Sequence, residues 1–267
     1  MVRGYIGRSY WGRDARTEAG GDADGGGADL ARMWRGAWGA ILLAAVVWSA
    51  RPLAVDAAGL IWAMLALAAT LALAGALGRI AITDDLTQAR GLGLGPVGLQ
   101  FGRPELLLLG AGLLCAVFMA MILSVVALAL LAVFGMAELN AQAIELRQWS
   151  AVGPAWKLIL LAVVTAFALF AVVAFSVRLS LFAPATLGRG HMVSLHSMAI
   201  ARGAFWPLLI GLTVTAAPKI ALVLLCGAGL LSGTVGWVIS AIVLTGLQAP
   251  LTMAFVGGAY RRMDVQD

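Results

Sequence analysis

The stretch FSVRLSLFAPATLGRGHMVSLHSMAIARGAFW, residues 175–206, decides the fold. It starts in the last turns of one apolar run, passes through a basic connector with two histidines, and ends where the next apolar run begins. Each run is long enough to cross a bilayer, which takes about 20 mainly apolar residues. The connector is therefore predicted to lie at one face of a membrane.

The composition of the whole chain fits the same environment. Hydrophobic residues make up 62% of the 267 residues, charged residues make up 12%, and the mean hydropathy is +0.96. A soluble domain carries about 25% charged residues, so this chain has too little charge to cover a surface that faces water. The sequence predicts an all-α integral membrane protein.

The formal net charge of +5 would, in a soluble chain, suggest nucleic acid as a partner. Binding through phosphates needs a contiguous basic patch. The arginines of this chain instead lie at the ends of apolar runs, as the positive-inside rule expects of a membrane protein. We expect no nucleic-acid partner.

Six segments are long and apolar enough to be transmembrane helices. The first is the shortest, and the third is long enough that it must tilt or protrude from the bilayer. The segments cover about residues 33–50, 57–78, 105–136, 155–182, 205–231 and 235–260.

The distribution of basic residues orients these segments. With the N-terminus in the cytoplasm, fourteen of the eighteen basic residues fall on the cytoplasmic side. The outer loops then hold only Arg51, Arg147 and Lys157. This bias predicts a multi-pass protein of the cell inner (plasma) membrane with both termini in the cytoplasm.

Outside the transmembrane domain, residues 29–262, we predict polar segments. Residues 1–28 are rich in Gly and Asp and lack the apolar core of a signal peptide, so they are expected to form a disordered cytoplasmic tail, and residues 263–267 a short one. One or two short amphipathic helices are expected at the interfaces, over residues 137–154 and after Ser194. The segment GLGLGPVG, residues 91–98, lacks the ending of a phosphate-binding loop and is expected to be a flexible loop.

Four stretches resemble known proteins: GALGRIAI (75–82), GPVGLQFGRPELLLLGAGLL (95–114), VRLSLFAPATLGRG (177–190) and ARGAFWPLLIGL (201–212). They resemble an uncharacterised family of alphaproteobacterial multi-pass membrane proteins. They are also similar, more distantly, to the membrane domain of glycerophosphoryl diester phosphodiesterases. The resemblance implies a six-helix membrane module. It does not imply hydrolysis, because that activity resides in a separate soluble domain that this chain lacks.

Three arginines near the cytoplasmic ends of the fourth and fifth segments are candidates for contact with anionic lipid. Arg178, Arg189 and Arg202 could together form a basic pocket for a lipid phosphate. The alternative is that these arginines only set the topology.

A second set of candidates lies within the fifth and sixth segments. Pro218 removes a helical hydrogen bond beside Lys219, and Gln248 and Pro250 repeat this pattern more weakly. Breaks in two neighbouring helices are typical of a transporter site at the membrane midplane. The alternative is that Lys219 extends to the outer interface and that the prolines are packing features.

No catalytic or metal-binding constellation is visible in the sequence. His191 and His196 are five residues apart, a poor spacing for a shared metal, and Cys115 and Cys226 lie separately in apolar runs. We therefore expect no cofactor, metal or enzymatic activity. The leading interpretation is a non-catalytic accessory, scaffolding or envelope-maintenance module. Its expected partners are anionic lipids, with possible self-assembly or a membrane partner protein. The alternative is a small transporter or lipid exporter.

Overall fold

A computed structural model of the chain describes residues 22–136, 142–143, 146, 152, 154–190 and 205–264. Within these residues every regular element is helical, which confirms the predicted all-α class. The main helices are α1 (Asp22–Ser49), α2 (Ala57–Ile82), α3 (Leu86–Gly91), α4 (Arg103–Met136), α7 (Ala155–Leu179), α8 (Phe182–Arg189), α10 (Phe205–Thr215), α11 (Ala217–Gly227), α12 (Gly233–Val243) and α13 (Ala249–Asp264). Two 3₁₀ turns, η1 (Arg51–Leu53) and η2 (Pro96–Gly98), and a π-helical segment, η3 (Leu244–Gln248), complete them.

Five stretches of helix are long and apolar enough to cross a membrane, and α10 with α11 makes a sixth if the bent pair is one span. These six coincide with the six predicted segments. The α10–α11 pair is bent by 48° just before Pro218, where a kink was predicted. Length and composition therefore support a membrane-embedded protein. α1 begins at Asp22, inside the stretch that the sequence predicts to be a tail.

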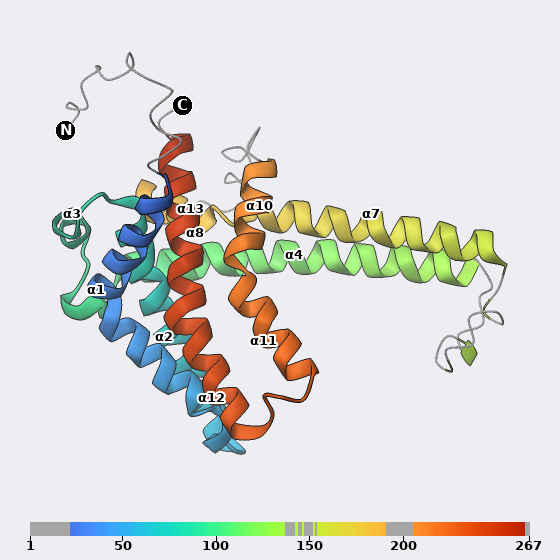
Figure 1. Cartoon of the computed structure of the whole chain (residues 1–267), viewed down its shortest axis with the longest axis horizontal. Coiled ribbons are helices and arrows are strands. Elements are labelled where there is room, and N and C mark those ends of the chain that lie inside the picture. Colours follow the sequence, from blue (N-terminus) through green and yellow to red (C-terminus); the bar gives the residue numbers. More distant parts are fainter. Residues whose placement is uncertain are drawn as a thin grey trace, which may run out of the picture.

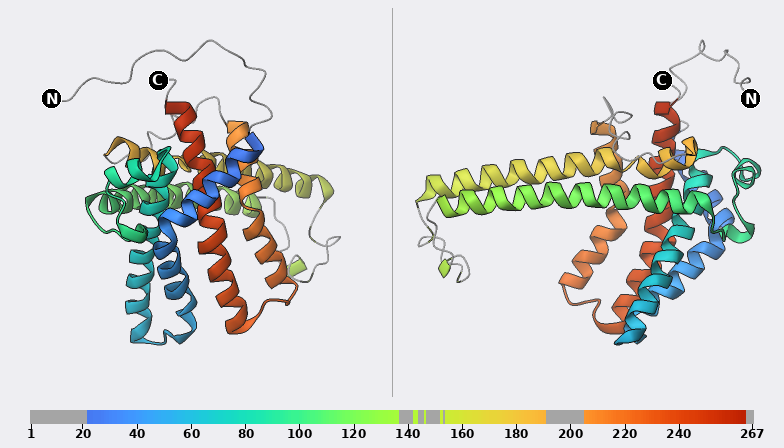
Figure 2. Two further views of the ribbon diagram at one scale, coloured as in Figure 1. Left: turned by 60° about the vertical axis from the view of Figure 1, so that its left-hand side comes forward. Right: turned by 180° about the vertical axis from the view of Figure 1, so that it is seen from behind.

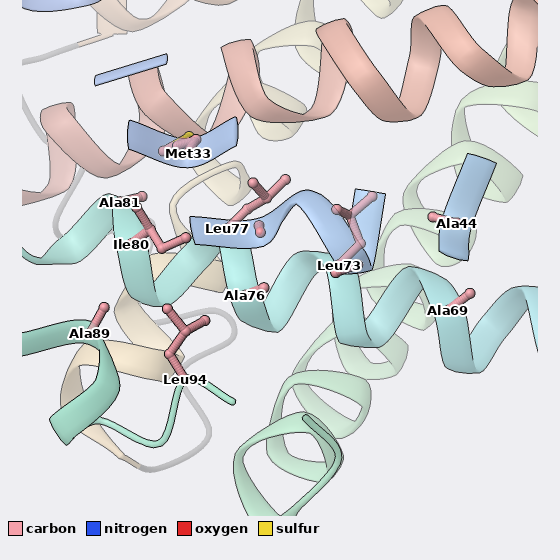
Figure 3. Close-up of a cluster of buried hydrophobic side chains, with 12 residues drawn as sticks. Met33, Ala44, Ala69, Leu73, Ala76, Leu77, Ile80, Ala81, Ala89 and Leu94 are labelled. Carbon is pink, nitrogen blue, oxygen red and sulfur yellow. The ribbon is translucent and has the colours of Figure 1, made fainter. Parts of the chain in front are cut away.

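Four of these stretches form a bundle, in which α1, α2, α10–α11 and α12–α13 run lengthwise beside one another (Figure 1, Figure 2). The start of α1 and the end of α13 lie at the same end of the bundle, where Arg261 is 3.6 Å from Asp29. We call this the Arg261 end. The largest core cluster joins α1 and α2 and includes Met33, Leu77 and Ile80 (Figure 3).

The helices α4 and α7 form a long antiparallel hairpin that projects sideways from the bundle, across its long axis (Figure 1, Figure 2). Apolar side chains are exposed along the length of both helices, from Leu106 to Leu131 and from Trp156 to Val173. A helix that is apolar all round is stable only in lipid or inside a protein. In this arrangement the hairpin and the bundle do not both cross one flat bilayer.

The break at Pro250 is compensated by a tryptophan from another helix. Proline has no N–H, so Pro250 removes one donor from the helical hydrogen bonds next to the carbonyl of Gly246. The indole Nε1 of Trp34 donates to this carbonyl over 2.7 Å. In the π-helical segment η3, which joins α12 to α13, the carbonyl of Gly246 is therefore hydrogen-bonded by a side chain of α1.

The end of α1 is completed in the same way. Pro52 frees the carbonyl of Trp48, and the indole of Trp237 donates to it over 2.7 Å. The indole of Trp62 donates to the carbonyl of Val47 over 2.8 Å. Since an unpaired backbone group in lipid costs several kcal/mol, these indoles fix how α2 and α12 meet the end of α1.

The segment between α2 and α4 corrects one prediction. Residues 91–98 do not form a loose loop, because η2 packs against α1 and both Leu94 and Gly98 are buried. Gly98 has φ +79°, and a Cβ there would lie 2.7 Å from the Cα of Ala37. The predicted interfacial helices fall mostly or wholly outside the described residues.

Candidate functional site

A buried ion pair joins the bundle to the hairpin. Arg79 of α2 donates through Nη1 to Oε1 of Glu105 of α4 over 2.6 Å, and the two side chains are 3% and 1% exposed. Arg79 Nε also donates to the carbonyl of Leu92 over 3.1 Å. The pair therefore ties together α2, the connecting segment and the first turn of the hairpin.

The local sequence places this pair. Glu105 is the third residue of α4, and its Oε2 accepts a hydrogen bond of 2.9 Å from the backbone N–H of Gly102, the residue before the helix. This is one half of a capping box. On the other side, a Cβ on Gly75 would lie 2.6 Å from Oε1 of Glu105, so only glycine leaves room for the carboxylate.

A cavity of about 260 Å³ lies beside the pair. Its lining comes from α2, the connecting segment, α4 and α8: Arg79, Leu92, Arg103, Pro104, Leu107, Thr186, Leu187 and Gly190. Within the described part of the chain, Arg103 has no acidic partner, and Nη2 of Arg79 donates to no assigned acceptor. The cavity thus has a net positive lining, because Glu105 offsets only one of the two guanidinium groups.

A second hollow, of about 370 Å³, is an apolar groove between α1 and α2. It is lined by Leu43, Val47, Leu65, Ala68, Ala69, Ala72, Leu99, Gln100 and Phe101. The Oε1 of Gln100 accepts from the backbone N–H of Gly95 over 3.2 Å, while its Nε2 is buried without a hydrogen-bond partner. The groove therefore has one spare donor at an otherwise apolar wall.

A charged network closes the Arg261 end of the bundle. Arg261 of α13 pairs with Asp84 over 2.5 Å, and Arg32 of α1 pairs with Asp29 over 2.7 Å and donates to the carbonyl of Asp84. The network joins α1 and α13 to the segment that follows α2. Next to it, Thr87 donates to the carboxylate of Asp85, and this bond lowers the pKa of Asp85.

The three arginines predicted to contact lipid are not assembled into one pocket by the described residues. Arg178 is exposed in the last turn of α7, and Arg189 is the last residue of α8, one residue before the cavity-lining Gly190. Arg202 lies outside the described residues.

The residues predicted for transport lie on neighbouring helices and line neither hollow. Lys219 is exposed, one residue after Pro218 in the first turn of α11, and forms no ion pair within the described part of the chain. Gln248 donates to Thr252 over 2.9 Å, and its Oε1 is buried without a partner. Pro250 is fully buried.

Metal-binding groups are not brought together in the part of the chain that the structure describes, where no cluster of three or more His, Cys, Asp or Glu side chains occurs. Cys115 is buried in α4, and Cys226 is exposed in α11. The two histidines, His191 and His196, lie outside the described residues.

Sequence reasoning missed the Arg79–Glu105 pair. Arg79 is one of the fourteen basic residues counted on the cytoplasmic side, and Glu105 was given no role. The available signal was a glycine, Gly75, one helical turn before Arg79, together with an acidic residue in the first turn of the next span. Small residues on the face of a charged side chain allow a second helix to approach it.

The fold and the site together define a membrane-embedded helical protein with a charged junction near one end of its bundle. Comparison of the chain with models of known families, with curated proteins and with solved structures gives no match.

Proposed function

We propose that the protein is a non-catalytic module of the cell inner (plasma) membrane that binds anionic lipid at the cytoplasmic ends of its helices. The observation that supports this proposal is the cavity lined by Arg79 and Arg103 beside the end of α2. Two guanidinium groups with a single carboxylate favour an anionic ligand, and Arg matches the geometry of phosphate oxygens. Basic pockets between helices on the cytoplasmic side bind lipid headgroups in this way.

The proposed topology places both termini in the cytoplasm. The Arg261 end of the bundle is the cytoplasmic end, and the arginines around it follow the positive-inside rule. Six spans also require the hairpin of α4 and α7 to turn from its sideways position until it stands beside the bundle in the bilayer. Its apolar surface is then covered by lipid along its whole length.

The experiment that tests this function is lipid analysis of the purified protein. The full chain is extracted in mild detergent, and its bound lipids are measured by native mass spectrometry. Replacing Arg103, Arg178, Arg189 and Arg202 by Gln is expected to remove most of the bound anionic lipid. The control replaces Arg51, Arg147 and Lys157, the three basic residues of the proposed outer loops, by Gln and leaves the lipid in place. Equal losses from both variants contradict the proposal.

A small transporter or lipid exporter is the second candidate, and one feature favours it. The α10–α11 pair is broken by 48° beside Lys219, and the neighbouring π-helical segment holds the unpartnered Oε1 of Gln248. Broken helices and intramembrane charges are typical of transport sites. If this reading holds, Lys219→Ala abolishes movement of the substrate in reconstituted vesicles while Lys157→Ala does not.

A further inference from the structure

The cavity and the apolar groove lie along one face of α2. The groove uses Leu65, Ala68 and Ala72, and the cavity uses Arg79. Steps of three, four and seven residues keep side chains within about 60° of one another on an α-helix. The two hollows are therefore aligned along the helix axis rather than on opposite sides of α2.

Neighbouring residues of one segment line the two hollows in turn. Leu99, Gln100 and Phe101 line the groove, and Arg103 lines the cavity. Gly102 lies between them and packs against Glu105, which in turn contacts α2 at Gly75. One short segment of chain thus borders a basic hollow on one side and an apolar hollow on the other.

The spacing matches one leaflet of a bilayer. At 1.5 Å per residue, Ala72 lies ~10 Å and Leu65 ~21 Å below Arg79 along α2. Half of a bilayer that is ~40–45 Å thick, headgroups included, is about 20 Å. A lipid phosphate at the arginines would place the glycerol region at Gly102 and the acyl chains at the depth of the groove.

We propose that the two hollows form a single site for one diacyl phospholipid with an anionic headgroup, with the phosphate at Arg79 and Arg103 and an acyl chain between α1 and α2. The inference rests on the proposed function and adds to it the class of lipid and its position. The buried Nε2 of Gln100 donates to an ester carbonyl, the acceptor that a diacyl lipid carries between its phosphate and its chains. A free phosphate would leave both this donor and the groove unused.

The test uses the full chain in nanodiscs with a phosphatidylglycerol that carries a photoreactive diazirine at mid-chain. After irradiation, we expect crosslinks to residues 43–47 of α1 and 65–72 of α2. Arg103→Gln is expected to reduce these crosslinks about tenfold, because a hydrogen bond to a charged group is worth roughly that factor in affinity. Arg103→Lys retains the charge and most of the crosslinking. The matched control, Arg90→Gln, changes an exposed arginine of the same connecting segment that lines neither hollow.

A second pair of variants fills the groove. Ala68→Phe is expected to reduce retention of phosphatidylglycerol at least about threefold, since dispersion contacts hold a chain in a membrane groove. Ala63→Phe makes the same change on the opposite, exposed side of α2 and leaves retention unchanged. Glycerol phosphate, which has the headgroup without chains, is expected to displace the lipid poorly.

Three outcomes overturn the inference. One is crosslinking in the groove that does not depend on Arg103, because the chain and the headgroup are then held separately. The second is retention that is lost with Arg103→Gln but unchanged with Ala68→Phe, which leaves the proposed function intact and limits the site to the headgroup. The third is displacement of the lipid by inorganic phosphate or glycerol phosphate at equal concentration. If every arginine variant keeps its anionic lipid, the proposed function is contradicted as well.

Discussion

Arg79 and Glu105 form the buried link between the bundle and the hairpin, with Nη1 of the arginine 2.6 Å from Oε1 of the glutamate. Removing one partner of such a pair costs about 3–5 kcal/mol, because the remaining charge is left buried and uncompensated. Glu105→Ala is therefore expected to lower the Tm of the protein in detergent strongly. The double variant Arg79→Met/Glu105→Leu should recover most of the loss, since an apolar pair of similar volume is often neutral.

The exposed Arg103, two residues before Glu105, provides the control for this cycle, because Arg103→Met removes a charge without leaving a buried one behind. Thermal unfolding of the wild type, Arg79→Met, Glu105→Leu and the double variant measures the coupling. If the double variant is as unstable as the sum of the single ones, the pair does not act as a unit and the link lies elsewhere.

Trp34 should stabilise the bundle through one hydrogen bond. Trp34→Phe retains most of the apolar surface but removes the donor to the carbonyl of Gly246, beside the N–H that Pro250 lacks. We expect a loss of about 1–3 kcal/mol. Trp38→Phe is the matched control, because its indole has no hydrogen bond within the described residues and is about as exposed. Equal Tm values for the two variants would show that the bond contributes nothing.

Close contact between α2 and α13 depends on Gly257. A Cβ there would lie 2.3 Å from the Cβ of Ala81 and 2.9 Å from its backbone oxygen, so even alanine must push the two helices apart. The adjacent Gly258 has open space around it. Gly257→Ala is expected to lower the Tm, whereas Gly258→Ala raises it slightly or leaves it unchanged because alanine favours the helix. The reverse order would place the helix contact on the other face of α13.

Hydropathy was sufficient for the six apolar segments, and Pro218 for the bend, because both depend on properties of single stretches of chain. A glycine in a span does not by itself mark a helix contact: Gly257 is at one, while Gly227 and Gly229 face open space. The direction of the hairpin and the pairing of Arg79 with Glu105 could not be predicted. An apolar side chain has the same hydropathy whether it touches lipid or another helix, and an arginine at the end of a span fits a topology signal and a buried pair equally well.

The hairpin leads to the most direct test of the proposed topology. The start of α4 contacts α2 at Gly75, which lies seven residues or ~10 Å before the end of α2. If the hairpin stayed in the membrane plane at that depth, the charged loop between α4 and α7 would lie near the inner leaflet, where each charge within the hydrocarbon costs about 2.5–3.5 kcal/mol. Six spans instead require α4, ~51 Å long, to lie alongside the bundle, which puts the loop at the outer surface.

We therefore expect a cysteine in place of the exposed Leu146 to react with a membrane-impermeant maleimide added outside intact spheroplasts. The background is a variant in which Cys115 and Cys226 are replaced. Val55→Cys, in the turn between α1 and α2, reports the outer side, and Thr87→Cys, in α3, the inner side. If position 146, like position 55, is labelled from outside the spheroplasts, the result supports six spans. Labelling only in inside-out vesicles, as at position 87, would show that the hairpin does not cross the bilayer and returns to the cytoplasmic side.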